Sequence, residues 1–93
     1  MADKRILIID DDPMVRSLVQ SILEPEGWTV VMAEDGNEGV EVLDSEPRPL
    51  NYRLVILDVV MPGMNGLDVL TRIKLHSHTS SLPIIMLTGE DKA

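Results

Sequence analysis

The chain has 93 residues, of which 44% are hydrophobic, and this is enough for one domain with an aliphatic core. Its formal net charge of −8 argues against the basic surface that nucleic-acid binding requires. The absence of cysteine excludes disulfides and thiolate metal sites, and it fits the reducing cytoplasm. No apolar run approaches the roughly 20 residues that span a bilayer, and the opening residues MADKR lack the apolar part of a signal peptide. We expect a single cytoplasmic domain over residues 1–93, without membrane contact.

The chain opens with a predicted strand and helix. Residues 5–9 (RILII) form a short β-branched run bounded by charge, which predicts a buried strand. Pro13 suits the first turn of a helix, and Asp12 can act as its N-cap. Apolar residues then recur at helical spacing: Val15, Leu18, Val19, Ile22 and Leu23. The helix should end near Pro25, with Gly27 as a cap residue.

The same alternation continues to the end of the chain. Further strands are expected over residues 28–33, 53–60 and 83–88, and further helices over 36–44 and 67–75. In the last helix, Leu67, Leu70 and Ile73 are expected to point inward. Strands that alternate with helices predict an α/β fold, in which helices cover both faces of a doubly wound parallel sheet.

Acidic residues stand where the first and third predicted strands end. RILII runs directly into Asp10, Asp11 and Asp12, and Asp58 closes the apolar stretch RLVIL. In open α/β sheets the functional site lies beyond the carboxyl ends of the strands. If these two strands are neighbours, their carboxylates approach, and two charges 4 Å apart repel by about 4 kcal/mol at an effective dielectric of 20. Bound Mg²⁺ would offset this repulsion; alternatively, the three aspartates only cap a helix.

Three segments together resemble the receiver domain of two-component response regulators: IIDDDP, LVILDVVMPGMNGLDVL and PIIMLTG. The resemblance covers nearly the whole chain in the right order. It implies the flavodoxin-like fold of CheY-like proteins, and the expected strand order 2-1-3-4 is taken from it. It also implies a phospho-acceptor signalling domain rather than an enzyme. The implied partner is a sensor histidine kinase or a phosphotransfer domain.

The resemblance also implies a role for each residue of the site. Asp58 corresponds to the phosphoacceptor, and Asp10 and Asp11 to the acidic pair that holds Mg²⁺. Val60 would offer its backbone carbonyl to the metal. Thr88 corresponds to the hydroxyl that binds the phosphoryl group, and its small neighbour Gly89 leaves room for that group.

The chain departs from the family pattern at its C-terminal end. Complete receivers continue with a fourth helix, a fifth strand that ends in lysine, and a fifth helix, whereas this sequence stops at TGEDKA, and Lys92 comes too early to replace that lysine. We therefore expect a C-terminally truncated receiver whose fourth strand is an exposed edge and pairs with a second copy. Two alternatives remain: a non-signalling, self-associating fragment, and a haloacid-dehalogenase-type phosphatase using Asp10 and Asp12. That phosphatase family usually has Thr or Val where this chain has Met14.

Overall fold

A four-stranded parallel sheet forms the centre of the molecule in the computed structural model, which describes residues 4–46, 51–61, 63, 65–76 and 79–87. The strand order is β2-β1-β3-β4, so the expected order is confirmed. The strands are β1 (Arg5–Ile9), β2 (Thr29–Ala33), β3 (Leu54–Asp58) and β4 (Ile84–Leu87). The helices are α1 (Pro13–Leu23), α2 (Gly36–Ser45) and α3 (Gly66–Leu75), with a 3₁₀ turn, η1 (Glu24–Glu26), after α1.

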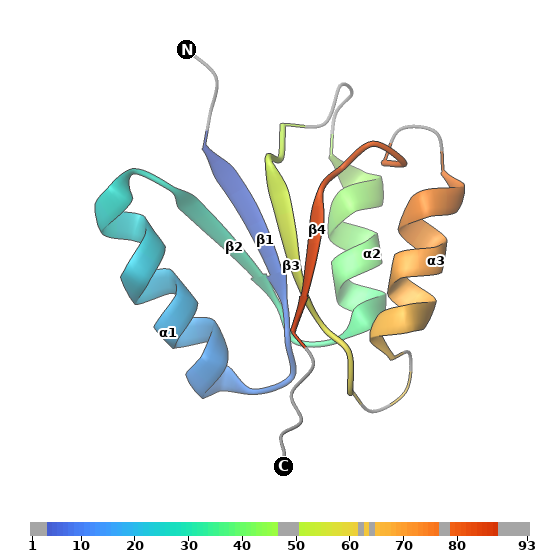
Figure 1. The fold of residues 1–93 in the computed structure, drawn as a ribbon, viewed down its shortest axis with the longest axis horizontal. Helices are drawn as coiled ribbons and strands as arrows, with labels where there is room; N and C mark the ends of the chain where they lie inside the picture. The colour runs from blue at the N-terminus through green and yellow to red at the C-terminus, as the bar shows by residue number, and fades with distance from the viewer. Residues whose placement is uncertain (1–3, 47–50, 62, 64, 77–78, 88–93) are drawn as a thin grey trace.

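The helices lie on both faces of the sheet, α1 on one and the pair α2 and α3 on the other (Figure 1). Successive strand residues point to opposite faces, so each strand contributes to two apolar clusters. The larger cluster lies on the side of α2 and α3 and includes Leu7, Ile9, Val55, Leu57, Val69 and Ile73. The smaller one contains Ile6, Ile8 and Val30, against which α1 packs Val15, Val19 and Leu23. This continuous burial explains why the strands are apolar throughout.

Helix α1 begins and ends where the sequence predicts. The Asp12 carboxylate accepts the backbone N–H of Met14 at 2.9 Å, and Pro13 occupies the first helical position. After Leu23 the chain tightens into η1, which contains Pro25, and Gly27 then adopts the left-handed conformation with φ +94°. The N-cap Asp12 lies three residues after Ile9, the last residue of β1, so a short loop joins the strand to the helix.

Two expectations about element ends and faces are wrong. The third strand, expected over 53–60, ends at Asp58, because the next residues turn out of the sheet. Leu67, expected to point inward, is 57% exposed, since α3 begins at Gly66 and buries Gly66, Val69 and Ile73 instead. The strands expected over 28–33 and 83–88 each begin one residue later than predicted, at Thr29 and Ile84, and Thr88 lies outside the described residues.

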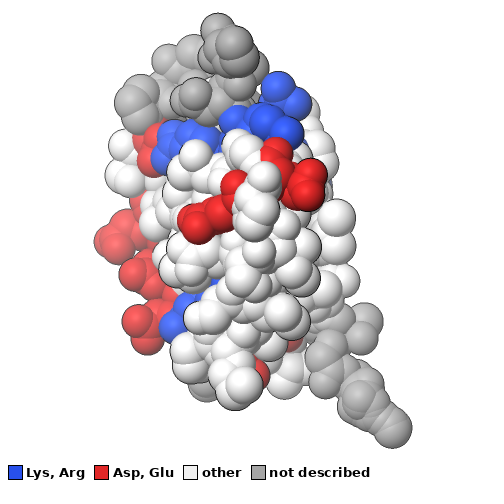
Figure 2. Space-filling view, turned by 90° about the vertical axis from the view of Figure 1, so that its left-hand side faces the viewer, with Lys and Arg blue, Asp and Glu red and all other residues white. Residues whose placement is uncertain are grey.

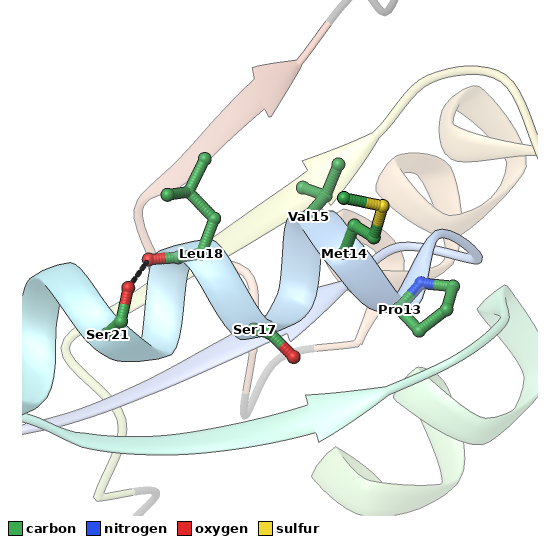
Figure 3. Close-up of a pocket in the computed structure, with 6 residues that line it drawn as sticks. All are labelled: Pro13, Met14, Val15, Ser17, Leu18 and Ser21. Atoms are coloured by element: carbon green, nitrogen blue, oxygen red, sulfur yellow. Dashed lines mark hydrogen bonds between the residues drawn. The ribbon is translucent and has the colours of Figure 1, made fainter.

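Helix α1 leaves a row of apolar side chains in water. Met14, Leu18 and Ile22 are 79%, 58% and 57% exposed, and they follow one another at intervals of four residues. Figure 3 shows Met14 and Leu18 standing away from the helix axis, with Ser17 and Ser21 beside them. Seen from the α1 side, a broad uncharged area covers the middle and lower part of the molecule (Figure 2). We call Met14, Leu18 and Ile22 the α1 row.

No helix in the described ranges is both long and apolar enough to cross a bilayer.

Strand β4 is the outer strand of the described sheet next to β3, and its Ile85 is 51% exposed.

The Asp12 cap can be tested separately from the charge of Asp12. We expect Asp12→Ala to lower the free energy of unfolding by about 1 kcal/mol relative to Asp12→Asn, because only asparagine keeps an oxygen for the Met14 N–H. Both variants remove the same charge, so urea unfolding of the pair isolates the cap hydrogen bond. Equal midpoints and slopes for the two variants would contradict this assignment.

Candidate functional site

Three carboxylates converge at the carboxyl end of β1 and β3. The parallel register pairs Ile8 with Ile56 and Ile9 with Leu57, which sets Asp10 beside Asp58. One oxygen from each of Asp10, Asp11 and Asp58 lies within 4.8 Å of the others. Asp10 and Asp58 are only 4% and 8% exposed, whereas Asp11 is open to solvent. The predicted convergence of these three residues is confirmed.

Backbone hydrogen bonds hold the two buried carboxylates in place. The N–H of Asp12 donates to Asp10 Oδ1 at 2.9 Å, and the N–H of Val60 donates to Asp58 Oδ1 at 3.2 Å. The strand ends are fixed as well, because Asp10 N–H donates to the carbonyl of Ala33 at 3.1 Å, on β2. Both carboxylates therefore have restricted directions before any ligand binds.

Gly66 allows the chain to pass close to the backbone of Asp58 at the start of α3. Its N–H donates to the Val59 carbonyl at 2.8 Å. A Cβ at this position would collide with the Asp58 carbonyl oxygen and with the Val59 Cα, and both are backbone atoms that cannot move aside easily. A glycine at the start of α3 is thus required because this position packs against the backbone of Asp58 and Val59 at the end of β3.

Burial and like charges raise the proton affinity of the site. Burial, followed by the charge of Asp10, raises the pKa of Asp58 from 3.8 to about 6; Asp11 adds to this and the Val60 N–H opposes it. Burial also raises the pKa of Asp10, against the hydrogen bond from Asp12. At neutral pH the cluster carries several negative charges in a small volume, which favours the binding of a cation.

The carboxylates line an open hollow of about 360 Å³. Its walls are formed by Asp10, Asp11, Asp12, Val15, Asp58, Val60 and Leu87. A larger hollow of about 660 Å³ runs along α1, but it is lined only by Pro13, Met14, Val15, Ser17, Leu18 and Ser21 (Figure 3). The larger hollow offers no charged group, so ion and phosphoryl chemistry belongs to the acidic one.

The remaining predicted site residues have different outcomes. Val60 lines the acidic hollow and bonds Asp58 through its N–H, while the metal-binding role of its carbonyl stays a prediction. Thr88, Gly89 and Lys92 lie outside the described residues. Asp12 lines the hollow but is not one of the three converging groups, and its carboxylate caps α1.

Two contributors to the site were not identified from the sequence. Gly66 attracts attention only as one glycine of a turn-rich segment, although its place at the start of a helix was a usable signal. Arg16 donates from Nη1 to the Asp10 carbonyl at 2.6 Å, and the sequence around Arg16 contains no feature that predicts this contact.

Comparison with known proteins identifies the family. The family model of the response regulator receiver domain matches residues 6–93. The transcriptional regulatory protein CpxR of Escherichia coli is 39% identical over 85 residues, which are 91% of this chain and 33% of that protein. The CAI-1 autoinducer sensor kinase/phosphatase CqsS of Vibrio cholerae is 34% identical over 90 residues, 96% of this chain and 12% of that protein. The chemotaxis protein CheY4 of Vibrio cholerae has a similar structure, with a TM-score of 0.85 and 30% identity over 98% of this chain and 72% of that one.

The fold and the acidic cluster define a CheY-like α/β signalling module. The chain belongs to the response regulator receiver family, a signalling family rather than an enzyme family in the usual sense. This membership decides against the dehalogenase-type phosphatase alternative. The chain spans about a third of the length of CpxR.

The raised pKa of Asp58 predicts a pH-dependent stability. Asp58 in the unfolded chain ionises near its ordinary value, so between about pH 4 and pH 6 the folded protein holds more protons at this site. The free energy of unfolding should therefore fall as pH rises through this window. At every pH above about 7, the folded protein should show the whole loss of stability that ionisation of Asp58 causes. Asp58→Asn cannot ionise and should raise the free energy of unfolding at pH 7 by on the order of 3 kcal/mol.

The measurement is urea unfolding in metal-free buffer between pH 4 and pH 8. The control Glu41→Gln makes the same charge change on an exposed position of α2 and should leave the profile unaltered. The assignment is wrong if Asp58→Asn keeps the wild-type pH profile.

Proposed function

We propose that this receiver domain accepts a phosphoryl group on Asp58 from a sensor histidine kinase or a phosphotransfer domain and acts as a signalling switch. The observation that carries the proposal is the convergence of Asp10, Asp11 and Asp58 within 4.8 Å at the carboxyl end of the sheet. The 34% sequence identity with the sensor kinase/phosphatase CqsS supports the proposal that this chain takes part in phosphoryl transfer. The cytoplasm is the compartment in which we expect this exchange, and the net charge of −8 disfavours contact with nucleic acid.

The donor set fits Mg²⁺. Carboxylate oxygens are hard ligands, and Mg²⁺ in phosphoryl-transfer sites is held by few protein carboxylates together with water and phosphate oxygens. Asp10, Asp11, Asp58 and the Val60 carbonyl would hold the ion. When bound, it would neutralise the charge on the transferring oxygens.

The residues of the chain then perform a simple displacement. Above about pH 6 Asp58 is a carboxylate, the form that can attack phosphorus. An O–P bond forms to Asp58 while the P–N bond of a phosphohistidine breaks, and the imidazole leaves with the electron pair. The Val60 N–H holds Oδ1 and so orients the carboxylate for attack. The Thr88 hydroxyl is proposed to bind the transferred group, with Gly89 leaving space beside it.

Labelling by a small phosphodonor tests the proposal. Phosphoramidate contains the P–N bond of phosphohistidine, so we expect it to label the protein in the presence of Mg²⁺ and not in excess chelator. Asp58→Asn should abolish labelling because an amide is not a nucleophile, and Glu41→Gln should retain it.

The label should be an acyl phosphate, cleaved by hydroxylamine. Labelling that survives Asp58→Asn, or that resists hydroxylamine, would contradict the assignment of Asp58.

We also propose that the 93-residue protein self-associates, with or without a signalling role. Among the described residues, β4 is paired on one side only, by β3, so two copies can join about a two-fold axis through Ile84–Leu87. The half-exposed Ile85 and the α1 row add apolar surface that water disfavours.

Sedimentation velocity over a micromolar concentration series tests this association. We expect a dimer whose dissociation constant rises at least tenfold in Ile85→Lys, since a charge then sits beside the pairing edge. Leu75→Lys is the matched control, because Leu75 is 77% exposed at the end of α3. A monomer at every concentration, with a native circular dichroism spectrum, would contradict the proposal.

A further inference from the structure

Arg16 connects helix α1 to the peptide that carries two of the three acidic residues. It lies in the first turn of α1, and its half-buried side chain donates from Nη1 to the carbonyl oxygen of Asp10 at 2.6 Å. Its own N–H donates to the Asp12 carbonyl at 3.1 Å. The short loop from Asp10 to Asp12 is therefore bonded to α1 at both of its ends.

This contact fixes the plane of the peptide between Asp10 and Asp11, which lies beyond the end of β1. The Asp10 carbonyl and the Asp11 N–H belong to the same planar peptide unit, so holding the carbonyl also sets the direction in which the chain enters Asp11. Asp10 has further anchors, since its N–H bonds to Ala33 and its carboxylate accepts the Asp12 N–H. Asp11 is the exposed member of the cluster, and the orientation of its backbone depends most on this peptide.

We propose that Arg16 is a positioning residue of the acidic site, which clamps the Asp10–Asp11 peptide and thereby presents the Asp11 carboxylate toward Asp10 and Asp58. The inference rests on the proposed function, because the ligand of the positioned carboxylates is a divalent cation. Groups that orient metal ligands from outside the coordination shell commonly change metal affinity 10- to 100-fold.

Charge and positioning predict opposite results for the loss of Arg16. A cation beside the site repels Mg²⁺, so if charge alone mattered, a neutral residue would bind Mg²⁺ more tightly. If Arg16 positions Asp11, the loss of its hydrogen bond weakens binding although the local charge becomes more negative. The sign of the change therefore separates the two roles.

The experiment is calorimetric titration of the metal-free protein with Mg²⁺ alone at pH 7.5. Arg16→Met keeps the apolar stem but removes the donor, and we expect about tenfold weaker binding. Arg16→Lys keeps a donor that can reach the carbonyl and should bind within about threefold of the wild type. Arg53→Met makes the same change at an exposed position at the opposite end of the sheet and should leave binding unchanged.

The outcomes are distinguishable from failure of the proposed function. If wild type binds no Mg²⁺, the proposed function is overturned and this inference with it. If wild type binds and Arg16→Met binds equally or more tightly, only the positioning role is overturned. Circular dichroism establishes whether the variants are folded, and if Arg16→Met is not, Arg16→Leu, which also has no donor, carries the same expectation.

Discussion

The mutual repulsion of three carboxylates is the constraint around which this molecule is arranged. Parallel strands β1 and β3 bring Asp10 and Asp58 to the same edge of the sheet, and Asp11 follows at once. Burial intensifies the repulsion, and its consequence is the raised pKa of Asp58. Such a cluster has an unfavourable electrostatic free energy, which a bound divalent cation would offset. The stability of the unliganded domain and its capacity to bind are thus two aspects of one interaction.

The surrounding fold holds this unfavourable cluster in place. Backbone N–H groups of Asp12 and Val60 fix one oxygen each on Asp10 and Asp58, and Gly66 lets the start of α3 pack against the backbone of Asp58 and Val59. Helix α1 contributes through its cap at Asp12 and through Arg16. The same helix exposes the α1 row, which begins at Met14, two residues after the cap Asp12.

Much of this arrangement is predictable from the sequence because it follows from general rules. Apolar runs that alternate with amphipathic stretches indicate a parallel sheet, and the rule of carboxyl strand ends locates Asp10, Asp11 and Asp58. The strand order came from family resemblance, since spacing alone does not determine it. The end of β3 at Asp58 was missed because Val59 and Val60 continue the apolar run after the chain has left the sheet. Leu67 was misplaced because its burial depends on where α3 begins, and the contacts of Gly66 and Arg16 depend on three-dimensional approach that no local pattern records.

Proton release on Mg²⁺ binding tests the central claim most directly. It is measured by calorimetry in two buffers of different ionisation enthalpy, at pH 6 and again at pH 8. Because the pKa of Asp58 is raised to about 6, the cluster should be partly protonated at pH 6 and release about half a proton per bound ion, and almost none at pH 8. Asp58→Asn should release much less at pH 6. Binding with no proton release at either pH, or with the same release in Asp58→Asn, would contradict the account of one coupled carboxylate cluster.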